Sequence, residues 1–244
     1  MQKIIFIIFF LVTNLVFAFE FPKNLSFQNQ KKVIGSLSVQ SQKKQLSDPT
    51  PLGGYKGWEA LMSVEALSLS ELNSIDPSIE NSDFLFLPRL QLAKGIYYDI
   101  DLSLYFSPLL VNKDIKDFGG QFRWLVLENF RNHYNLSLSF QVNSTNYKDI
   151  LFSTNLGFDL IVSRLWNENS LAFGYGFIRN TSRIVGTNSG VNITSSGQEV
   201  AMTENNMHLF VSGTHWWTQS LYGTLNLNFY ESAVVSSLAL GVRY

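Results

Sequence analysis

The chain has 244 residues, of which 45% are hydrophobic and 15% charged, with a formal net charge of −1 and no cysteine. It is too apolar for a disordered chain, and its balanced charge lacks the basic excess of a nucleic-acid-binding protein. The absence of cysteine excludes disulfides, thiolate metal sites and a cysteine nucleophile. The charged fraction is nevertheless low for a soluble domain, where about 25% is usual, while the mean hydropathy of +0.05 is far below that of a helical membrane protein.

Residues 1–18 have the pattern of a secretory signal peptide. Lys3 supplies a positive charge, residues 4–12 are an unbroken apolar run, and Val16 and Ala18 are the residues that precede a plausible cleavage site. The alternative is a membrane anchor, but an anchor needs roughly 20 apolar residues, and polar residues interrupt this run. We therefore predict export, with cleavage after Ala18.

Residues 19–57 are predicted to form a separate N-terminal segment, located in the periplasm or acting as a plug. An alternating stretch within it would allow one more strand, but an odd number of strands would place the two termini on opposite sides of a membrane. We therefore predict that residues 27–41 form a short amphipathic helix or plug-like segment that uses Phe27, Ile34 and Leu37.

Strict alternation of apolar and polar residues marks the rest of the chain, residues 58–244. In residues 98–106, one face carries Tyr, Ile, Leu, Leu and Phe, and the other carries Asp, Asp, Ser and Tyr. Residues 134–142 and 221–230 alternate similarly, and each segment has about the 9–11 residues with which a tilted strand crosses a bilayer. Noisier segments of this kind are 58–67, 84–94, 118–127, 151–163, 171–179, 205–213 and 234–244.

This pattern predicts an all-β fold, a transmembrane antiparallel up-and-down β-barrel of about ten strands, with twelve as the alternative. A secreted soluble β-sandwich is the competing fold. Aromatic residues near the strand ends are expected to form two interfacial belts, among them Trp216 and Tyr147. The connectors alternate in length, and the long ones are residues 68–83, 107–117, 143–150 and 180–204.

The C-terminal strand ends on an aromatic residue. Leu238, Leu240, Val242 and Tyr244 fall on one face, which resembles the assembly signal of bacterial outer-membrane barrels. Together with the export signal, this predicts a bacterial outer-membrane location, with the barrel assembly machinery and outer-membrane lipid as partners and with no nucleic-acid partner. The short turns are then periplasmic and the long loops external.

Several segments resemble a broad group of poorly characterised Gram-negative outer-membrane β-barrel proteins. They are Pro51–Trp58, Leu87–Gly95, Phe118–Trp124 and Leu240–Tyr244. The resemblance covers most of residues 48–244 and implies fold and location. The group has no established activity, so the resemblance implies no role for any single residue.

Charged residues are predicted to line the lumen, with a sign that alternates across four neighbouring strands. This charge ladder consists of Glu59, Glu65, Arg89, Asp99, Asp101 and Arg123. It is interpreted either as a structural ladder of cross-strand pairs or as a constriction that selects solutes by charge. On the opposite wall, Gly174 and Gly176 would leave a slot or make room for the N-terminal segment.

No motif supports catalysis. His133 and His215 lie in predicted turns, and His208 is predicted to face inward, where a nucleophile such as Ser212 or Ser237 would have to lie within hydrogen-bond distance. We therefore predict no enzyme activity, no catalytic residues, no metal site and no cofactor.

The predicted function is that of a narrow passive channel or a structural surface protein, with small solutes or an unidentified surface ligand as partners. Two alternatives remain open. One is an adhesion or recognition protein that acts through loops 68–83 and 180–204. The other is an outer-membrane hydrolase centred on His208.

Overall fold

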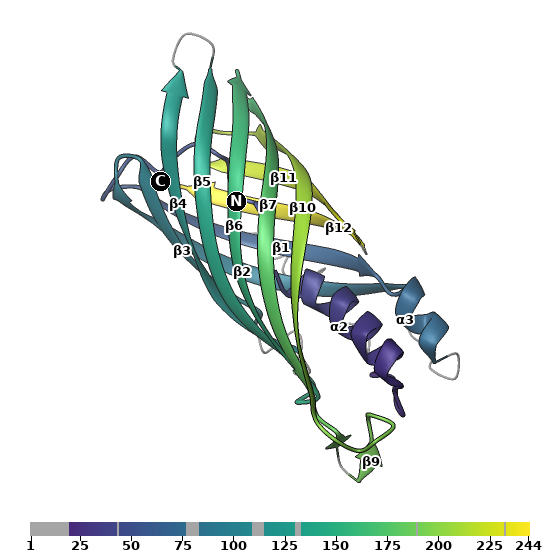
Figure 1. The fold of residues 1–244 in the computed structure, drawn as a ribbon. Helices are drawn as coiled ribbons and strands as arrows, with labels where there is room; N and C mark the ends of the chain where they lie inside the picture. Colours follow the sequence, from purple (N-terminus) through teal and green to yellow (C-terminus); the bar gives the residue numbers. More distant parts are fainter. Residues whose placement is uncertain are drawn as a thin grey trace.

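The structure is a computed structural model that describes residues 20–42, 44–76, 83–108, 115–129, 133–188, 190–231 and 233–244. The predicted signal peptide lies outside these residues. Within them, ten antiparallel strands form one closed barrel (Figure 1), which confirms the predicted fold with ten strands rather than twelve. The barrel strands are β1 (Trp58–Ser68), β2 (Phe84–Tyr97), β3 (Ile100–Phe106), β4 (Ile115–Asn129), β5 (Tyr134–Tyr147), β6 (Leu151–Trp166), β7 (Asn169–Ile184), β10 (Val200–Trp216), β11 (Leu221–Tyr230) and β12 (Val234–Arg243).

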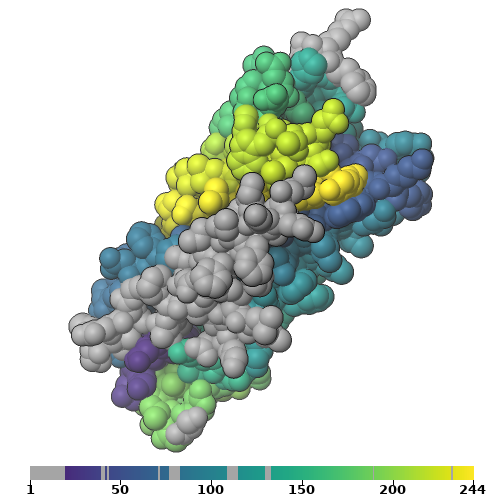
Figure 2. Space-filling model, turned by 180° about the vertical axis from the view of Figure 1, so that it is seen from behind, coloured from purple at the N-terminus to yellow at the C-terminus, as the bar shows by residue number. Residues whose placement is uncertain are grey.

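Each barrel strand pairs with the next along the chain, and β1 pairs with β12 to close the barrel. Figure 2 shows this seam, where the yellow C-terminal strand lies against the blue residues of the first strands. Among the described residues, no helix is both long and apolar enough to cross a bilayer. The elements outside the barrel wall are α2 (Phe27–Ser41), α3 (Ser70–Ile75), β8 (Thr187–Asn188) and β9 (Val191–Asn192).

The alternation in the sequence sets the two faces of the wall. In β6, Asp159 and Ile161 are buried in the lumen, while Phe158 and Leu160 point outward and are 36% and 40% exposed. Successive side chains of a strand point to opposite faces, so the same rule holds around the barrel. The outer surface therefore carries a continuous band of exposed large apolar side chains, which monomeric soluble proteins rarely have.

The two ends of the barrel differ. At the turn end, β2 meets β3, β6 meets β7, β10 meets β11, and the chain reaches Tyr244. At the opposite loop end, the β8–β9 hairpin extends beyond the wall, and the helices α2 and α3 lie at the opening of the barrel (Figure 1). The predicted loop 180–204 is largely strand, because Ile184 of β7 still pairs with Val200 of β10. Only residues 185–199 connect these strands, since β7 and β10 continue beyond the apolar band with mostly polar residues, such as Arg179–Ser182 and Thr203–Asn206.

Most of the predicted loop 143–150 is strand, because β5 continues to Tyr147, and only residues 148–150 form a tight turn to β6. Lys148 and Asp149 have φ angles of +52° and +56°, and the Asp149 amide donates to Asn146 Oδ1 at 2.9 Å, so the side chain of Asn146 closes the turn. Hydrogen bonds from Asn146 and Lys116 to the Asp149 carboxylate hold its pKa below the usual range.

The helix α2 covers the loop end of the lumen. The Asn29 amide donates to the Ser26 side chain at 3.3 Å and caps its first turn. Ile34 and Leu37 are buried in one apolar cluster with residues of the surrounding strands, whereas Phe27 is 68% exposed. The predicted helix is therefore confirmed, but the prediction that Phe27 belongs to its buried face is wrong.

After α2, residues 42 and 44–57 pass through the lumen to the turn end, and we call them the lumen segment. At the loop end, Leu25 forms a parallel bridge with Thr194 beside the β8–β9 hairpin. At the turn end, Trp58 exchanges two backbone hydrogen bonds with Tyr244. The residues before α2 and the C-terminus thus lie at opposite ends of the barrel, although the number of strands is even, because the lumen segment itself crosses the barrel.

Candidate functional site in the barrel lumen

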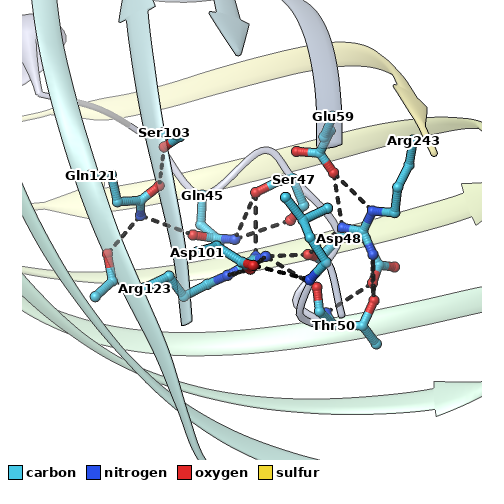
Figure 3. A network of polar contacts seen from close by, with 12 residues as sticks. Gln45, Ser47, Asp48, Thr50, Glu59, Asp101, Ser103, Gln121, Arg123 and Arg243 are labelled. Carbon is cyan, nitrogen blue, oxygen red and sulfur yellow. Dashed lines mark hydrogen bonds and ion pairs between the residues drawn. The ribbon is translucent and has the colours of Figure 1, made fainter. Parts of the chain in front are cut away.

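Asp48 of the lumen segment is held by four strands of the wall near the turn end. Figure 3 shows its contacts with Arg123 and Arg243. Its carboxylate Oδ2 accepts hydrogen bonds from Ser170 Oγ at 2.9 Å and from Trp216 Nε1 at 3.1 Å. Its backbone carbonyl accepts from Arg123 at 2.8 Å and from Arg243 at 3.2 Å. The donors belong to β4, β7, β10 and β12, so one residue connects both sides of the barrel.

Two ion pairs surround this residue. Arg123 Nη2 lies 2.6 Å from Asp101 Oδ2, and Arg243 Nη2 lies 2.8 Å from Glu59 Oε2. Both arginines also bind Thr50. Arg123 donates to the Thr50 carbonyl at 3.0 Å, and Arg243 donates to the Thr50 hydroxyl oxygen at 2.7 Å. Each guanidinium thus pairs with a wall carboxylate and also binds the lumen segment, which matches the several donors of an arginine.

A second network lies further into the lumen. Arg89 lies between two carboxylates, with Glu65 Oε1 at 2.5 Å from Nη1 and Asp117 Oδ2 at 2.7 Å from Nε. Arg89 also donates to the Gln42 carbonyl at 3.0 Å. The Thr145 hydroxyl donates to the other oxygen of Asp117. Because burying a single charge is costly, these mutual contacts are what allow ionised groups to remain in this position.

His208 faces the lumen, as predicted, and is buried. Its Nε2 lies 3.3 Å from Asp159 Oδ1, and its ring stacks on Tyr230 with centroids 5.2 Å apart. The hydroxyl of Tyr230 donates to the side chain of Gln42. Ser212 donates its hydroxyl hydrogen to the Gln45 carbonyl at 3.4 Å, so this serine binds the lumen segment rather than the histidine.

Gly174 and Gly176 make room for side chains of the wall. A Cβ on Gly176 would lie 2.2 Å from both Asp159 Oδ1 and His208 Cε1, and one on Gly174 would lie 2.1 Å from the Phe210 ring. Those side chains occupy the space above each glycine. The slot predicted opposite the charge ladder is therefore filled.

Five of the six predicted ladder residues are buried in the lumen, namely Glu59, Glu65, Arg89, Asp101 and Arg123. The prediction for Asp99 is wrong. Asp99 is exposed in the turn between β2 and β3, where the alternating pattern does not apply because β3 begins only at Ile100. Among the described residues, no group of three His, Cys, Asp or Glu is placed to hold a metal ion.

Several site residues were missed by the sequence analysis. Asp117, Asp159 and Arg243 stand at inward positions of alternating strands, so the same pattern was available to find them. Asp48 and Lys44 had no such signal, because they lie in an irregular segment. The Lys44 ammonium donates to the carbonyls of Val39 at 2.6 Å and Gln42 at 3.1 Å.

Two aromatic residues expected in the interfacial belts lie inside the barrel instead. Trp216 binds Asp48, as described above, and Tyr147 donates its hydroxyl hydrogen to the Leu37 carbonyl of α2 at 3.1 Å. Both residues stand at inward positions of their strands. The Trp216 indole nitrogen and the Tyr147 hydroxyl each donate to a residue of the N-terminal part of the chain. Position near a strand end therefore did not decide which face they occupy.

The predicted assembly-signal residues Leu238, Leu240, Val242 and Tyr244 stand at outward positions of β12 and its end. Leu238 is 63% exposed, and the ring of Tyr244 stacks on Trp58 with centroids 4.7 Å apart. Tyr244 thus lies at the seam between the first and last strands. Its recognition by an assembly machinery stays a prediction.

No protein-family model matches the chain, and no curated relative matches it. Solved structures similar to it include the N-terminal β-barrel domain of Pseudomonas aeruginosa OprF, with 11% identity, a TM-score of 0.36 and coverage of 78% of this chain and 99% of that chain. The KdgM porin has 10% identity, a TM-score of 0.38 and coverage of 75% and 98%. The Escherichia coli outer membrane protease OmpT has 8% identity, a TM-score of 0.39 and coverage of 84% and 99%. The closed barrel of this chain follows from its own strand pairing.

Proposed function

We propose that this protein is an outer-membrane β-barrel, sealed by its own lumen segment, that serves as a structural surface protein and carries out no covalent chemistry. The observation that carries the proposal is Asp48, which binds side chains from four strands across the lumen. An open passive channel needs a continuous water-filled path, and the lumen segment occupies this one.

The outer surface supports a membrane location. Leu156, Leu160 and Val162 of β6 point outward and are 62%, 40% and 45% exposed. A bilayer admits only structures whose backbone hydrogen bonds are satisfied internally, and a closed barrel meets this requirement because it has no free edge. Export of such a barrel leads to the outer membrane, where the loop end would face the outside.

The contacts of the lumen segment support a sealed lumen. The wall binds backbone carbonyls at regular intervals along the segment: Arg89 binds the carbonyl of Gln42, and Asn226 Nδ2 donates to the carbonyl of Gln45 at 3.0 Å. The carbonyl of Asp48 continues the series. Polar groups that would bind water or solutes in a channel are therefore used to hold the chain.

Conductance in planar bilayers tests the proposal. The full-length protein should show no steady conductance, whereas a variant without residues 27–50 should conduct, provided that it keeps the heat-dependent gel mobility of a folded barrel. A deletion of residues 187–192 removes the β8–β9 hairpin outside the barrel wall and is the matched control, which should stay closed.

Steady conductance of the full-length protein would overturn the proposal in favour of a passive channel. A folded but silent 27–50 deletion would show that the wall alone closes the lumen. If that deletion does not fold, the substitution Asp48→Ala keeps the chain intact, leaves Arg123 and Arg243 paired with Asp101 and Glu59, and should produce brief openings. Its complete silence would count against sealing by the lumen segment.

A recognition role is the second candidate, favoured by the long strands at the loop end. β7 and β10 have 16 and 17 residues, against about 11 for a membrane crossing. Their outward residues change from Phe177 and Met207 to Arg179 and Asn205 towards the loop end. Deleting residues 187–192 should then abolish adhesion of bacteria to a surface while the barrel stays folded, and unchanged adhesion would contradict this role.

A hydrolase centred on His208 is not part of the proposal. The residue is buried behind the lumen segment, its Nε2 faces Asp159, and the amide nitrogen of Gln42 lies 3.5 Å from the same atom. A substrate would have to displace Gln42 to reach this ring. His208→Ala should leave esterase and peptidase assays at the level of the unmodified protein.

A further inference from the structure

Arg164 lies on the outer surface at the turn end of β6. Residues of this strand alternate between buried and exposed, and Arg164 follows the outward Val162. Its guanidinium carbon lies 5.2 Å from the centroid of the Tyr134 ring on β5, the residue with which it is paired across the two strands. This cation–π contact orients the guanidinium along the outer wall.

A pocket of about 460 Å³ surrounds this side chain, within the range typical of small-molecule sites. It combines one cation with an apolar wall and an indole. The residues that line it are Tyr134, Val162, Ser163, Arg164, Trp166, Leu171 and Phe173. Val162 and Phe173 are 45% and 53% exposed, so the part of the pocket away from the turn is open and apolar.

Arg164 has no acidic partner among the residues that the structure describes. The arginines of the lumen each pair with a carboxylate, and Arg183 at the loop end has Glu199 at 3.6 Å. In the part of the chain that the structure describes, no carboxylate lies within ion-pair distance of Arg164. Glu128 lines the neighbouring groove between β4 and β5, which shares the Tyr134 ring. The pocket therefore has one cation available for an anion.

The depth of the pocket indicates which anion it would meet. Tyr134 and Trp166 are 43% and 42% exposed, and amphipathic rings of this kind prefer the level of the lipid headgroups. A glycerophospholipid combines an anionic phosphodiester for the guanidinium with acyl chains for the apolar wall. We infer that this pocket binds one glycerophospholipid, with its phosphodiester on Arg164 and an acyl chain along Val162 and Phe173. This inference rests on the proposed membrane location.

Native mass spectrometry of the full-length barrel in detergent tests the inference, with phosphatidylethanolamine, a diacylglycerol of the same acyl chains and inorganic phosphate as probes. One phosphatidylethanolamine should be retained, and the diacylglycerol should not. Because a charge-assisted hydrogen bond contributes about a factor of ten or more in affinity, Arg164→Gln should weaken retention about tenfold. Arg179→Gln removes an exposed outward arginine on β7 and should leave retention unchanged.

The inference is overturned if Arg164→Gln retains phosphatidylethanolamine as well as the unmodified protein does, or if the diacylglycerol is retained equally well. Either result would leave only unspecific lipid contact. Binding of inorganic phosphate without the lipid would also overturn it. Flotation with liposomes and heat-dependent mobility are measured on the same samples. A barrel that does not insert contradicts the proposed function, whereas a barrel that inserts but retains lipid without Arg164 contradicts this inference alone.

Discussion

Arg243, next to the end of the chain, binds Asp48, which lies 195 positions earlier. Its Nη2 donates to the Asp48 carbonyl at 3.2 Å, and its Nη1 lies 3.7 Å from the carboxylate. The same guanidinium pairs with Glu59 on the first strand. One side chain therefore contacts both the first strand, against which the last strand closes the barrel, and the segment that occupies the lumen.

Arg243→Gln should strongly destabilise the barrel. The substitution leaves the buried Glu59 carboxylate without its cation, and breaking a buried ion pair typically costs about 3–5 kcal/mol. The free energy of unfolding, measured by denaturant titration of the barrel in liposomes, should fall accordingly. Arg183→Gln is the matched control, because Arg183 and Glu199 are both about half exposed and 3.6 Å apart, and it should cost less than about 1 kcal/mol. Equal losses for the two variants would contradict a special role of the lumen network.

Gly176→Ala should destabilise the barrel by about 1–3 kcal/mol, as overpacking of a filled interior does. The new methyl group would overlap Asp159 and His208, each 2.2 Å from the ideal Cβ position. Gly213→Ala is the control, because a Cβ at Gly213 meets nothing within 4 Å. Thermal unfolding followed by circular dichroism should separate the two variants, and a neutral Gly176→Ala would mean that the lumen has free space at this point.

Tyr147→Phe should loosen α2 without unfolding the barrel. The change removes the hydrogen bond from the Tyr147 hydroxyl to the Leu37 carbonyl, which is worth about 1 kcal/mol. Amide hydrogen exchange in residues 27–41 should become about fivefold faster, while exchange in β6 and β7 stays the same. Tyr175→Phe removes a hydroxyl that faces Met207 on the outer surface, and it should leave exchange in α2 unchanged. Unchanged exchange in Tyr147→Phe would show that apolar packing alone holds the helix.

Leu160→Arg should cost about 2–4 kcal/mol if the outer band of the barrel faces lipid, because a charge near the bilayer centre is unfavourable. Thr154→Arg, on the same outer face of β6 but nearer the loop end, should cost about 0–1 kcal/mol. Folding titrations in liposomes measure both differences. A neutral Leu160→Arg would contradict the membrane location and, with it, the inference about Arg164.

The barrel was predictable because its signal is local. The alternation in residues 98–106, 134–142 and 221–230 depends only on the period of two residues that any strand has, and these segments are β3, β5 and β11. The same rule failed at Asp99, where the chain turns. It also underestimated β7 and β10, since their residues nearest the loop end are mostly polar and lack the contrast that marks a strand crossing a membrane.

The lumen was predictable only in part. Alternation placed Glu65, Arg89 and Arg123 inside, but it does not specify which partner each one meets. Arg89 binds Asp117 on β4 as well as Glu65, and Arg123 binds carbonyls of the lumen segment. Cross-strand neighbours alone therefore do not account for these pairs, because the lumen segment supplies a third set of partners.

By itself, the sequence determined most of the strands and, for most positions within them, the face on which the side chain stands, since these depend on neighbours within a few positions. The tertiary structure decided that the barrel is occupied. The path of the lumen segment depends on contacts such as that of Asp48 with Arg243, which exist only after the last strand has closed the wall. No local pattern in an irregular segment records such a contact, because the energy that selects it comes from satisfying buried charges and carbonyls contributed by distant strands.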